Sequence, residues 1–270
     1  MLQASHALTN VLVAVTYANA YGKFAVTDQL CGFTFSGSDA VGSPIALTPA
    51  QRASSFAAQN GIVGTPVYEA SVGGAKVYNL GISPSTNLAD QSLDGFLCLR
   101  ALATGVDPVT GGALSATLAA QSARVRAGAA EVTATGNLRG KPALIVQGRS
   151  DTLIPVNFAS RSYLGLNAVA EGGAGRLRYI EVTNANHFDT FTSALPQNIV
   201  PLHVYLFRAL DAMLAHLRSN VALPPSQVVR TRTCPEATTP ITITNVPPIA
   251  TVPAAGDAIG VSGTTVEVPL

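Results

Sequence analysis

The spacing of apolar residues predicts helices in the first half of the chain. Residues 2–21 are largely apolar, with Leu8, Leu12, Val15 and Ala18 at helical spacing, which predicts a helix buried on more than one side. The segments between the helices are rich in Gly and Pro, so we expect them to be irregular. Capping signals and apolar spacing predict the other helices, over 49–60, 90–105 and 113–134.

After residue 140 the pattern becomes that of a parallel sheet. Residues 141–148 form a short apolar run bounded by Pro and Gly, typical of a strand buried on both faces. A helix over 156–169, a strand over 176–182 and a long amphipathic helix over 198–219 are predicted to follow. This order predicts an α/β protein with a doubly wound sheet. The last residues, 224–270, are rich in Pro and Thr and are expected to form an extended or β-rich tail.

Composition excludes several classes of protein. Only 11% of residues are charged, against about 25% in an ordinary soluble domain, and the net charge is +1. Without a basic excess, a nucleic-acid partner is not expected. The 47% hydrophobic content argues against a disordered chain, and no run approaches the ~20 apolar residues of a membrane span. The few charges favour a secreted or periplasmic protein. Because residues 1–20 do not read as a signal peptide, we expect the chain to begin inside a longer protein.

The cysteines and the polar residues suggest no metal or cofactor. Cys31, Cys98 and Cys234 are separated by 67 and 136 residues, which matches no zinc-ligand pattern. A Cys31–Cys98 disulfide is one possibility, and Cys98 as a small buried hydrophobe is the other. No glycine-rich loop follows a strand in a phosphate-binding pattern.

Candidate chemistry lies in the loops after the two predicted strands. Asp151 follows the first strand and His187 follows the second, and the carboxyl ends of parallel strands meet at one edge of a sheet. An Asp there can accept the Nδ1–H of a histidine, fix its tautomer and stabilise its protonated ring. We therefore predict Asp151 as the acid and His187 as the general base of a catalytic site. Asp189 is the rival carboxylate, and Asp151 could instead cap a helix.

The nucleophile of such a site is missing. The sequence contains no Gly-x-Ser-x-Gly, and its loosest approximation is centred on Ser38. A nucleophile elbow needs a buried strand before the serine and a helix after it, and the surroundings of Ser38 predict neither. We expect the serine and most of the sheet to lie upstream of Met1, in a missing N-terminal half of the same enzyme.

Four parts of the chain carry a family resemblance. They read AYGKFAVTD and LCGF at 20–28 and 30–33, SLDGFLCLR at 92–100, KPALIVQGRSD at 141–151 and NANHFD at 184–189. Over about residues 1–245 the chain resembles the C-terminal part of the D-(−)-3-hydroxybutyrate oligomer hydrolases, which are secreted serine esterases. The resemblance implies the C-terminal portion of an α/β-hydrolase-like fold, a Ser-Asp-His mechanism using Asp151 and His187, and soluble 3-hydroxybutyrate oligomers as substrates.

The resemblance also implies a division of the chain. Residues 1–140 would be a helical and loop region that includes a lid, 141–223 the core that carries acid and base, and 224–270 the tail. We expect Phe33, Phe35 and Phe96 to line an acyl pocket.

Two alternatives stay open. A tannase-like or feruloyl-esterase-like enzyme would share the fold, although such enzymes commonly tie the serine and histidine loops with a disulfide and no Cys lies near His187. The other alternative is a non-catalytic chain or binding module, which the missing serine favours.

Overall fold

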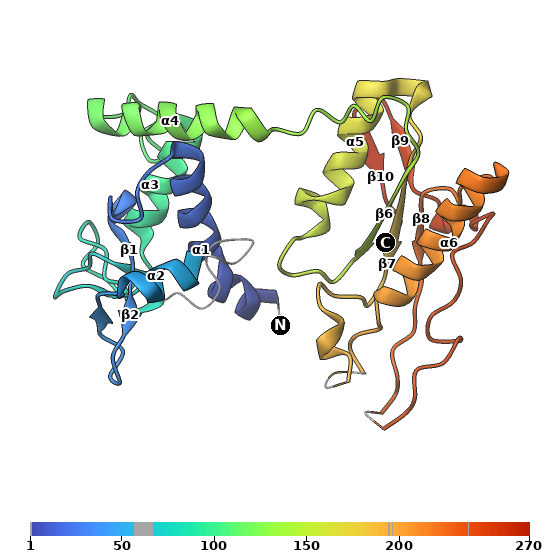
Figure 1. Ribbon diagram of the computed structural model, residues 1–270, viewed down its shortest axis with the longest axis horizontal. Helices are drawn as coiled ribbons and strands as arrows, with labels where there is room; N and C mark the ends of the chain where they lie inside the picture. The colour runs from blue at the N-terminus through green and yellow to red at the C-terminus, as the bar shows by residue number, and fades with distance from the viewer. Residues whose placement is uncertain (1, 57–66, 194, 196, 237) are drawn as a thin grey trace. The chain divides into compact units, whose positions relative to one another are not determined.

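The chain folds into two compact units. A computed structural model describes residues 2–56, 67–193, 195, 197–236 and 238–270. The units are Met1–Thr133 and Ala134–Leu270, called unit 1 and unit 2 below, and each is described by itself. Figure 1 shows helices and short strands in unit 1 and a sheet between helices in unit 2.

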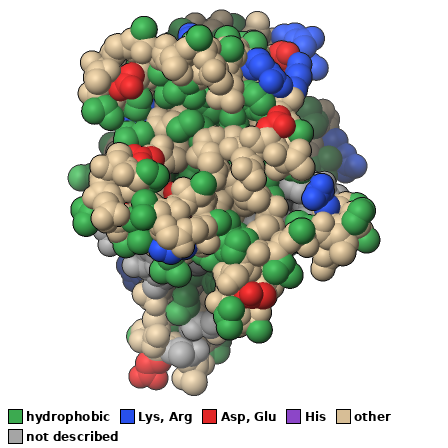
Figure 2. All heavy atoms as spheres, turned by 90° about the vertical axis from the view of Figure 1, so that its left-hand side faces the viewer, with side chains coloured by type: hydrophobic (Ala, Val, Ile, Leu, Met, Phe, Trp, Pro, Cys, Tyr) green, Lys and Arg blue, Asp and Glu red, His purple; other side chains and the backbone are tan. Residues whose placement is uncertain are grey.

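Unit 1 is mainly helical. The helix that contains Gly128 approaches the helix that contains Tyr21 closely. This approach depends on Gly128, since a Cβ there would lie 1.9 Å from the carbonyl oxygen of Tyr21. On the face drawn in Figure 2, charged side chains form small separate groups among apolar and uncharged ones. The helices are α1 (Leu2–Gly22), α2 (Pro49–Phe56), α3 (Leu93–Thr104) and α4 (Ala116–Val132). The predicted end of the second helix, at residue 60, lies outside the described residues.

Short strands replace part of the irregular structure expected in unit 1. Three of them form an antiparallel sheet in the order β1-β4-β5, and the other two form a hairpin. Strands of two or three residues are too short to show an alternating pattern, so the hydrophobic pattern could not predict them. They are β1 (Phe33–Phe35), β2 (Gly37–Ser38), β3 (Pro44–Ile45), β4 (Val67–Glu69) and β5 (Lys76–Val77).

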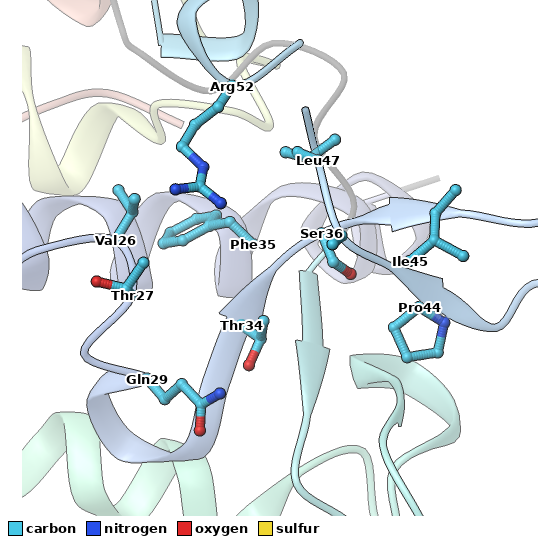
Figure 3. A pocket seen from close by; sticks show the side chains of 11 residues that line it. Val26, Thr27, Gln29, Thr34, Phe35, Ser36, Pro44, Ile45, Leu47 and Arg52 are labelled. Atoms are coloured by element: carbon cyan, nitrogen blue, oxygen red, sulfur yellow. The ribbon is translucent and has the colours of Figure 1, made fainter. Parts of the chain in front are cut away.

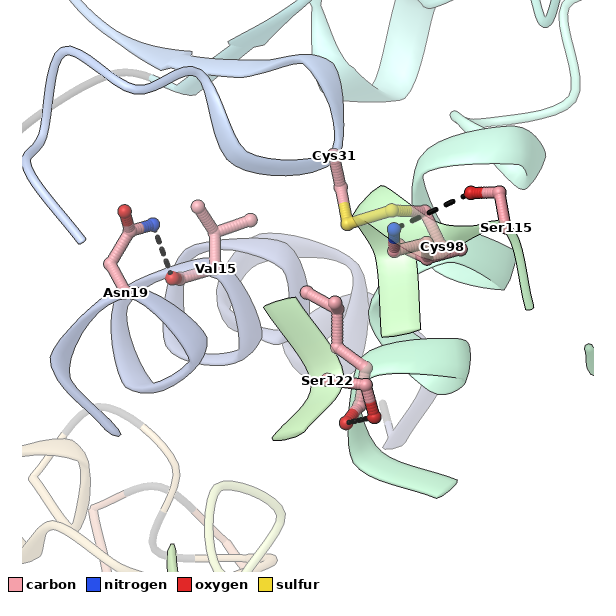
Figure 4. Close-up of a disulfide and its surroundings, with 8 residues drawn as sticks. Val15, Asn19, Cys31, Cys98, Ser115 and Ser122 are labelled. Atoms are coloured by element: carbon pink, nitrogen blue, oxygen red, sulfur yellow. Dashed lines mark hydrogen bonds between the residues drawn. A yellow bond between two sulfur atoms is a disulfide. The ribbon is translucent and has the colours of Figure 1, made fainter. Parts of the chain in front are cut away.

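A disulfide links two segments of unit 1. Cys31, beside β1, is bonded to Cys98 of α3, so the first of the two alternatives for these cysteines is the one observed. Figure 4 shows this disulfide near α1, where Asn19 donates to the carbonyl of Val15 at 2.8 Å. Cys234, in unit 2, is a buried free thiol.

Unit 2 contains a parallel three-stranded sheet. The strands β6 (Ala143–Gly148), β7 (Leu177–Val182) and β8 (Gln227–Val229) lie in the order β6-β7-β8. The helices α5 (Ser160–Glu171) and α6 (His203–Ser219) cover its two faces. The expected strands and helices of this part are therefore present, whereas β8 belongs to the segment for which only a tail was expected.

Alternate side chains of β7 pack on opposite faces of the sheet. Leu177 and Tyr179 pack with Leu164 of α5, while Ile180 and Val182 pack with Tyr205 of α6.

The tail adds a hairpin of β9 (Gly260–Ser262) and β10 (Thr265–Glu267). Since the described chain contains both α-helices and β-sheets, it is a mixed α/β protein. No helix in the described part is long and apolar enough to cross a bilayer.

Candidate functional site

Asp151 is held rigidly in the loop after β6. Its side chain is almost completely buried, and its Oδ1 accepts hydrogen bonds from the backbone N–H groups of Leu153 at 3.0 Å and Ile154 at 2.9 Å. Its Oδ2 lies 2.9 Å from Nδ1 of His187. Because two backbone donors fix one oxygen, the other oxygen is aimed at the imidazole.

His187 lies in the loop after β7, and its orientation is also fixed. Its backbone N–H donates to Oδ1 of Asn186 at 2.7 Å, and its ring meets the edge of Phe188 at 4.5 Å between ring centres. An ionised Asp151 can only accept, so Nδ1 carries the proton of this bond and Nε2 of the neutral ring has a free lone pair. The side chain is 30% exposed.

The two loops meet because β6 and β7 are neighbouring parallel strands and because Gly148 has no side chain. A Cβ on Gly148 would lie 2.3 Å from the carbonyl oxygen of Ala185 in the histidine loop. That same carbonyl accepts a hydrogen bond from the backbone N–H of Ser150 at 3.0 Å. The close approach of the two backbones therefore sets the spacing between Asp151 and His187.

A buried carboxylate binds the loop after β6 that holds Asp151, which we call the acid loop, and sequence reasoning missed this carboxylate. Glu181 of β7 is fully buried, and Tyr179 Oη donates to its Oε2 at 2.8 Å. Arg161 of α5 donates to both carboxylate oxygens, at 2.8 and 2.7 Å, and Arg149 Nε also donates to Oε1. Arg149 comes two residues before Asp151, and its Nη2 donates to the carbonyl of Pro269 at 2.7 Å. The one available signal was a charged residue inside an apolar strand.

This network controls the ionisation of Glu181. Burial alone raises the pKa of its carboxyl, but hydrogen bonds from Arg161, Tyr179 and Arg149 outweigh burial, so the pKa is held below its usual value. The pKa of the Tyr179 hydroxyl is raised by burial and by the neighbouring carboxylate. Glu181 is therefore an anion that binds two cations beneath the acid loop.

The rival carboxylate Asp189 and the two histidines of α6 have other surroundings. Asp189 accepts from the backbone N–H groups of Leu202 and His203 at 2.6 and 2.7 Å, so it caps the start of α6, and its Oδ2 also lies 2.7 Å from Nδ1 of His203. His216, near the end of α6, bonds the carbonyl of Val221 at 2.7 Å. Neither histidine meets Asp151 in the described structure.

The surroundings of Ser38 do not form a nucleophile elbow. Ser38 ends the two-residue strand β2, is exposed, and donates to the carbonyl of Asp39 at 3.2 Å. The next strand, β3, returns antiparallel to it, so no helix follows the serine.

Of the three phenylalanines expected in an acyl pocket, one lines a pocket of unit 1. Phe35 contributes to a pocket of about 330 Å³, where it faces Arg52 (Figure 3). Phe33 is instead buried in the core of unit 1, with Phe96 packed against it at 6.4 Å between ring centres. Phe33 was therefore wrongly placed, since its apolar side chain stabilises the core. Among the described residues, no group of three or more His, Cys, Asp or Glu could hold a metal ion.

Comparison with known proteins identifies relatives along the whole chain. Residues 1–270 match the family model described as 3HB-oligomer hydrolase. Proteins named D-(-)-3-hydroxybutyrate oligomer hydrolase from Azoarcus sp. (strain BH72) and Cupriavidus metallidurans (strain CH34) are 48% and 46% identical to it. The alignments cover 99% and 95% of this chain but only 38% and 36% of those relatives. No solved structure matches the chain. On these matches, the chain belongs to the 3HB-oligomer hydrolase family.

Proposed function

We propose that this chain supplies the acid and the general base of a serine esterase that hydrolyses soluble 3-hydroxybutyrate oligomers. The observation that carries the proposal is the 2.9 Å contact between Asp151 Oδ2 and His187 Nδ1, at the carboxyl ends of two adjacent parallel strands. The names of the relatives supply the substrate class. The sheet β6-β7-β8 would be part of an α/β-hydrolase sheet, in which the acid precedes the histidine along the chain, as it does here.

In each half of this mechanism, His187 takes a proton from the attacking group and gives it to the leaving group. Its Nε2 removes the proton of a serine hydroxyl as the serine oxygen attacks the ester carbonyl, and Asp151 stabilises the imidazolium that results. When the tetrahedral intermediate collapses, the ester C–O bond breaks and the imidazolium protonates the leaving 3-hydroxyl oxygen. Water then attacks the acyl carbon with His187 as base, the bond from that carbon to the serine oxygen breaks, and the imidazolium protonates the serine oxygen, which releases the carboxylic acid and the free serine.

The serine would come from outside this sequence. The chain spans little more than a third of the length of the curated relatives, so the longer protein has room for the nucleophile and further strands. We also propose a secreted or periplasmic location. The Cys31–Cys98 disulfide supports it, because disulfides persist mainly in oxidising compartments.

The test is to express this chain joined to the missing part of the family protein and to change the two site residues. Hydrolysis of 3-hydroxybutyrate dimer and of p-nitrophenyl butyrate is followed for His187→Ala and Asp151→Asn. Both variants should lose about 10³-fold or more in kcat, since each removes part of one catalytic unit. The matched control is His203→Ala, a histidine that also bonds an Asp, at 2.7 Å, and it should stay within about tenfold of the parent.

Two results would contradict the proposal. One is a loss of less than tenfold in His187→Ala. The other is labelling of the isolated 270-residue chain by a serine-reactive phosphonate together with turnover, because the nucleophile would then lie within this sequence.

A further inference from the structure

Strand β6 has the composition of a central strand but lies at an edge. Its residues read ALIVQG, with no charge and no Pro, and in the described part of the chain it pairs only with β7. Apolar side chains cover both of its faces, since Leu144 and Val146 pack with the α6 side and Ala143 and Ile145 with the α5 side. Natural edge strands are usually protected by Lys, Pro or a bulge, whereas continuous apolar runs are typical of strands inside parallel sheets.

The alternation of backbone hydrogen bonds along β6 shows which N–H and C=O groups face its open edge. The N–H of Ala143 donates to Arg176 at 3.4 Å and the N–H of Arg149 donates to Val182 at 2.8 Å, so odd-numbered residues of this segment face β7. In a parallel pair the next residues point the opposite way. The N–H and C=O groups of Leu144 and Val146 therefore face away from β7, where the described chain has no strand.

The other edge of the same sheet is covered. Gln227 of β8 forms an antiparallel bridge with Ala258, and its side-chain amide donates to the carbonyl of Ala250 at 2.8 Å. The N–H of Ile259 donates to the carbonyl of Ser226 at 2.9 Å. The tail thus covers the β8 edge, whereas no strand of the part that the structure describes pairs with the outer edge of β6.

A second surface of unit 2, on helix α6, is apolar and exposed. Helix α6 packs on the sheet through Tyr205, and it contacts β6. Five large apolar residues of α6 are between 45% and 67% exposed, and after an adjacent first pair they follow at intervals of three or four positions. We call them the α6 stripe: Leu206, Phe207, Leu210, Leu214 and Leu217.

We propose that the open edge of β6 and the α6 stripe together form the docking site for the part of the longer family protein that lies outside this sequence. One of its strands would add to β6, and its apolar residues would cover the stripe. The amount of chain available for this is large, since the sequence spans only 36% to 38% of its relatives. The inference rests on the proposed function, in which that part also brings the serine.

A second copy of this chain is the rival occupant. Two copies joined through β6 about a two-fold axis would pair antiparallel, because a regular parallel ladder is not symmetric about such an axis. The run of Leu, Ile and Val in β6, covered on both faces, is instead typical of an all-parallel sheet. This favours a strand of a different segment over a second β6.

The experiment co-expresses this chain with the separate remainder of the Azoarcus relative and measures residue-resolved amide hydrogen exchange. On complex formation the exchange rates of the Leu144 and Val146 amides should fall at least about tenfold. The rates of the Ile145 and Gln147 amides, which already face β7, should change much less. The variant Leu210→Glu with Leu214→Glu should weaken binding about 100-fold or more. The matched control is Val169→Glu, a residue of α5 that is 60% exposed on the other side of the sheet.

Three outcomes would overturn the docking site: no complex, a complex that leaves the Leu144 and Val146 amides unprotected, or equal weakening by the control variant. Concentration-dependent protection of these amides in this chain alone would assign the edge to a second copy and would also overturn it. The ester assay separates this inference from the proposed function. Hydrolysis without protection would reject only the docking site, and protection without hydrolysis would reject only the proposed function.

Discussion

Replacing Glu181 by Gln should destabilise unit 2 far more than an ordinary loss of a charge. The carboxylate is fully buried and binds the guanidinium groups of Arg149 and Arg161, whose side chains are 23% and 25% exposed. Breaking a buried ion pair by removing one partner costs about 3–5 kcal/mol, because the remaining charge stays desolvated. Water reaches part of both guanidinium groups, so we expect the lower end, about 3 kcal/mol. For a unit of this size that corresponds to a fall in Tm of about 10 °C.

Amide hydrogen exchange of the β6 and β7 peptides measures this change locally, in the whole chain. The control is Glu131→Gln, which removes a carboxylate 2.9 Å from Lys23 where both side chains are 60% exposed or more. Such a surface pair contributes less than about 1 kcal/mol. The reasoning is refuted if the loss of unfolding free energy in Glu181→Gln exceeds that of the control by less than about 1 kcal/mol. The Glu181 carboxylate would then not be needed to stabilise Arg149 and Arg161.

Three further predictions follow from described contacts. Gly148→Ala should cost about 2 kcal/mol or more and slow any ester hydrolysis, since its Cβ would lie 2.3 Å from a backbone oxygen of the histidine loop; Gly173→Ala, with open space at its Cβ, is the neutral control in urea unfolding. Replacing Cys31 and Cys98 by Ser should destabilise unit 1 by about 4 kcal/mol for a loop of 67 residues, and an unchanged unfolding midpoint would contradict this. The folded-state pKa of Glu181 lies below the usual 4.5, so its stabilisation is complete above that pH and is lost as pH falls through the folded value. Acid titration followed by circular dichroism should therefore show a steeper loss of stability below pH 4.5 in the parent than in Glu181→Gln.

The sequence was informative where one pattern extended over several residues. The apolar runs of β6 and β7 predict buried parallel strands, and chain order alone then puts Asp151 and His187 at one edge of a sheet. The three residues of β8 gave no such signal, because a strand of that length has no measurable period and its place depends on contacts with β7 and the tail.

Partner choice among charged residues could not be predicted. The sequence shows that Glu181 interrupts an apolar strand, but not that cations from the acid loop and from α5 converge on it. Likewise Asp189 is two residues from His187 in sequence, yet its oxygens bind the first backbone N–H groups of α6. Both outcomes depend on which segments meet in space, and the local pattern does not carry that information.

The contact between Arg149 and Pro269 has a consequence for the order of events during synthesis. The two residues are 120 positions apart, so the bond cannot form on the ribosome until nearly all of unit 2 has left the exit tunnel. The acid loop is therefore completed late, after the helices that form from local contacts. Until then the loop that holds Asp151 lacks this anchor, and the spacing between Asp151 and His187 is set without it.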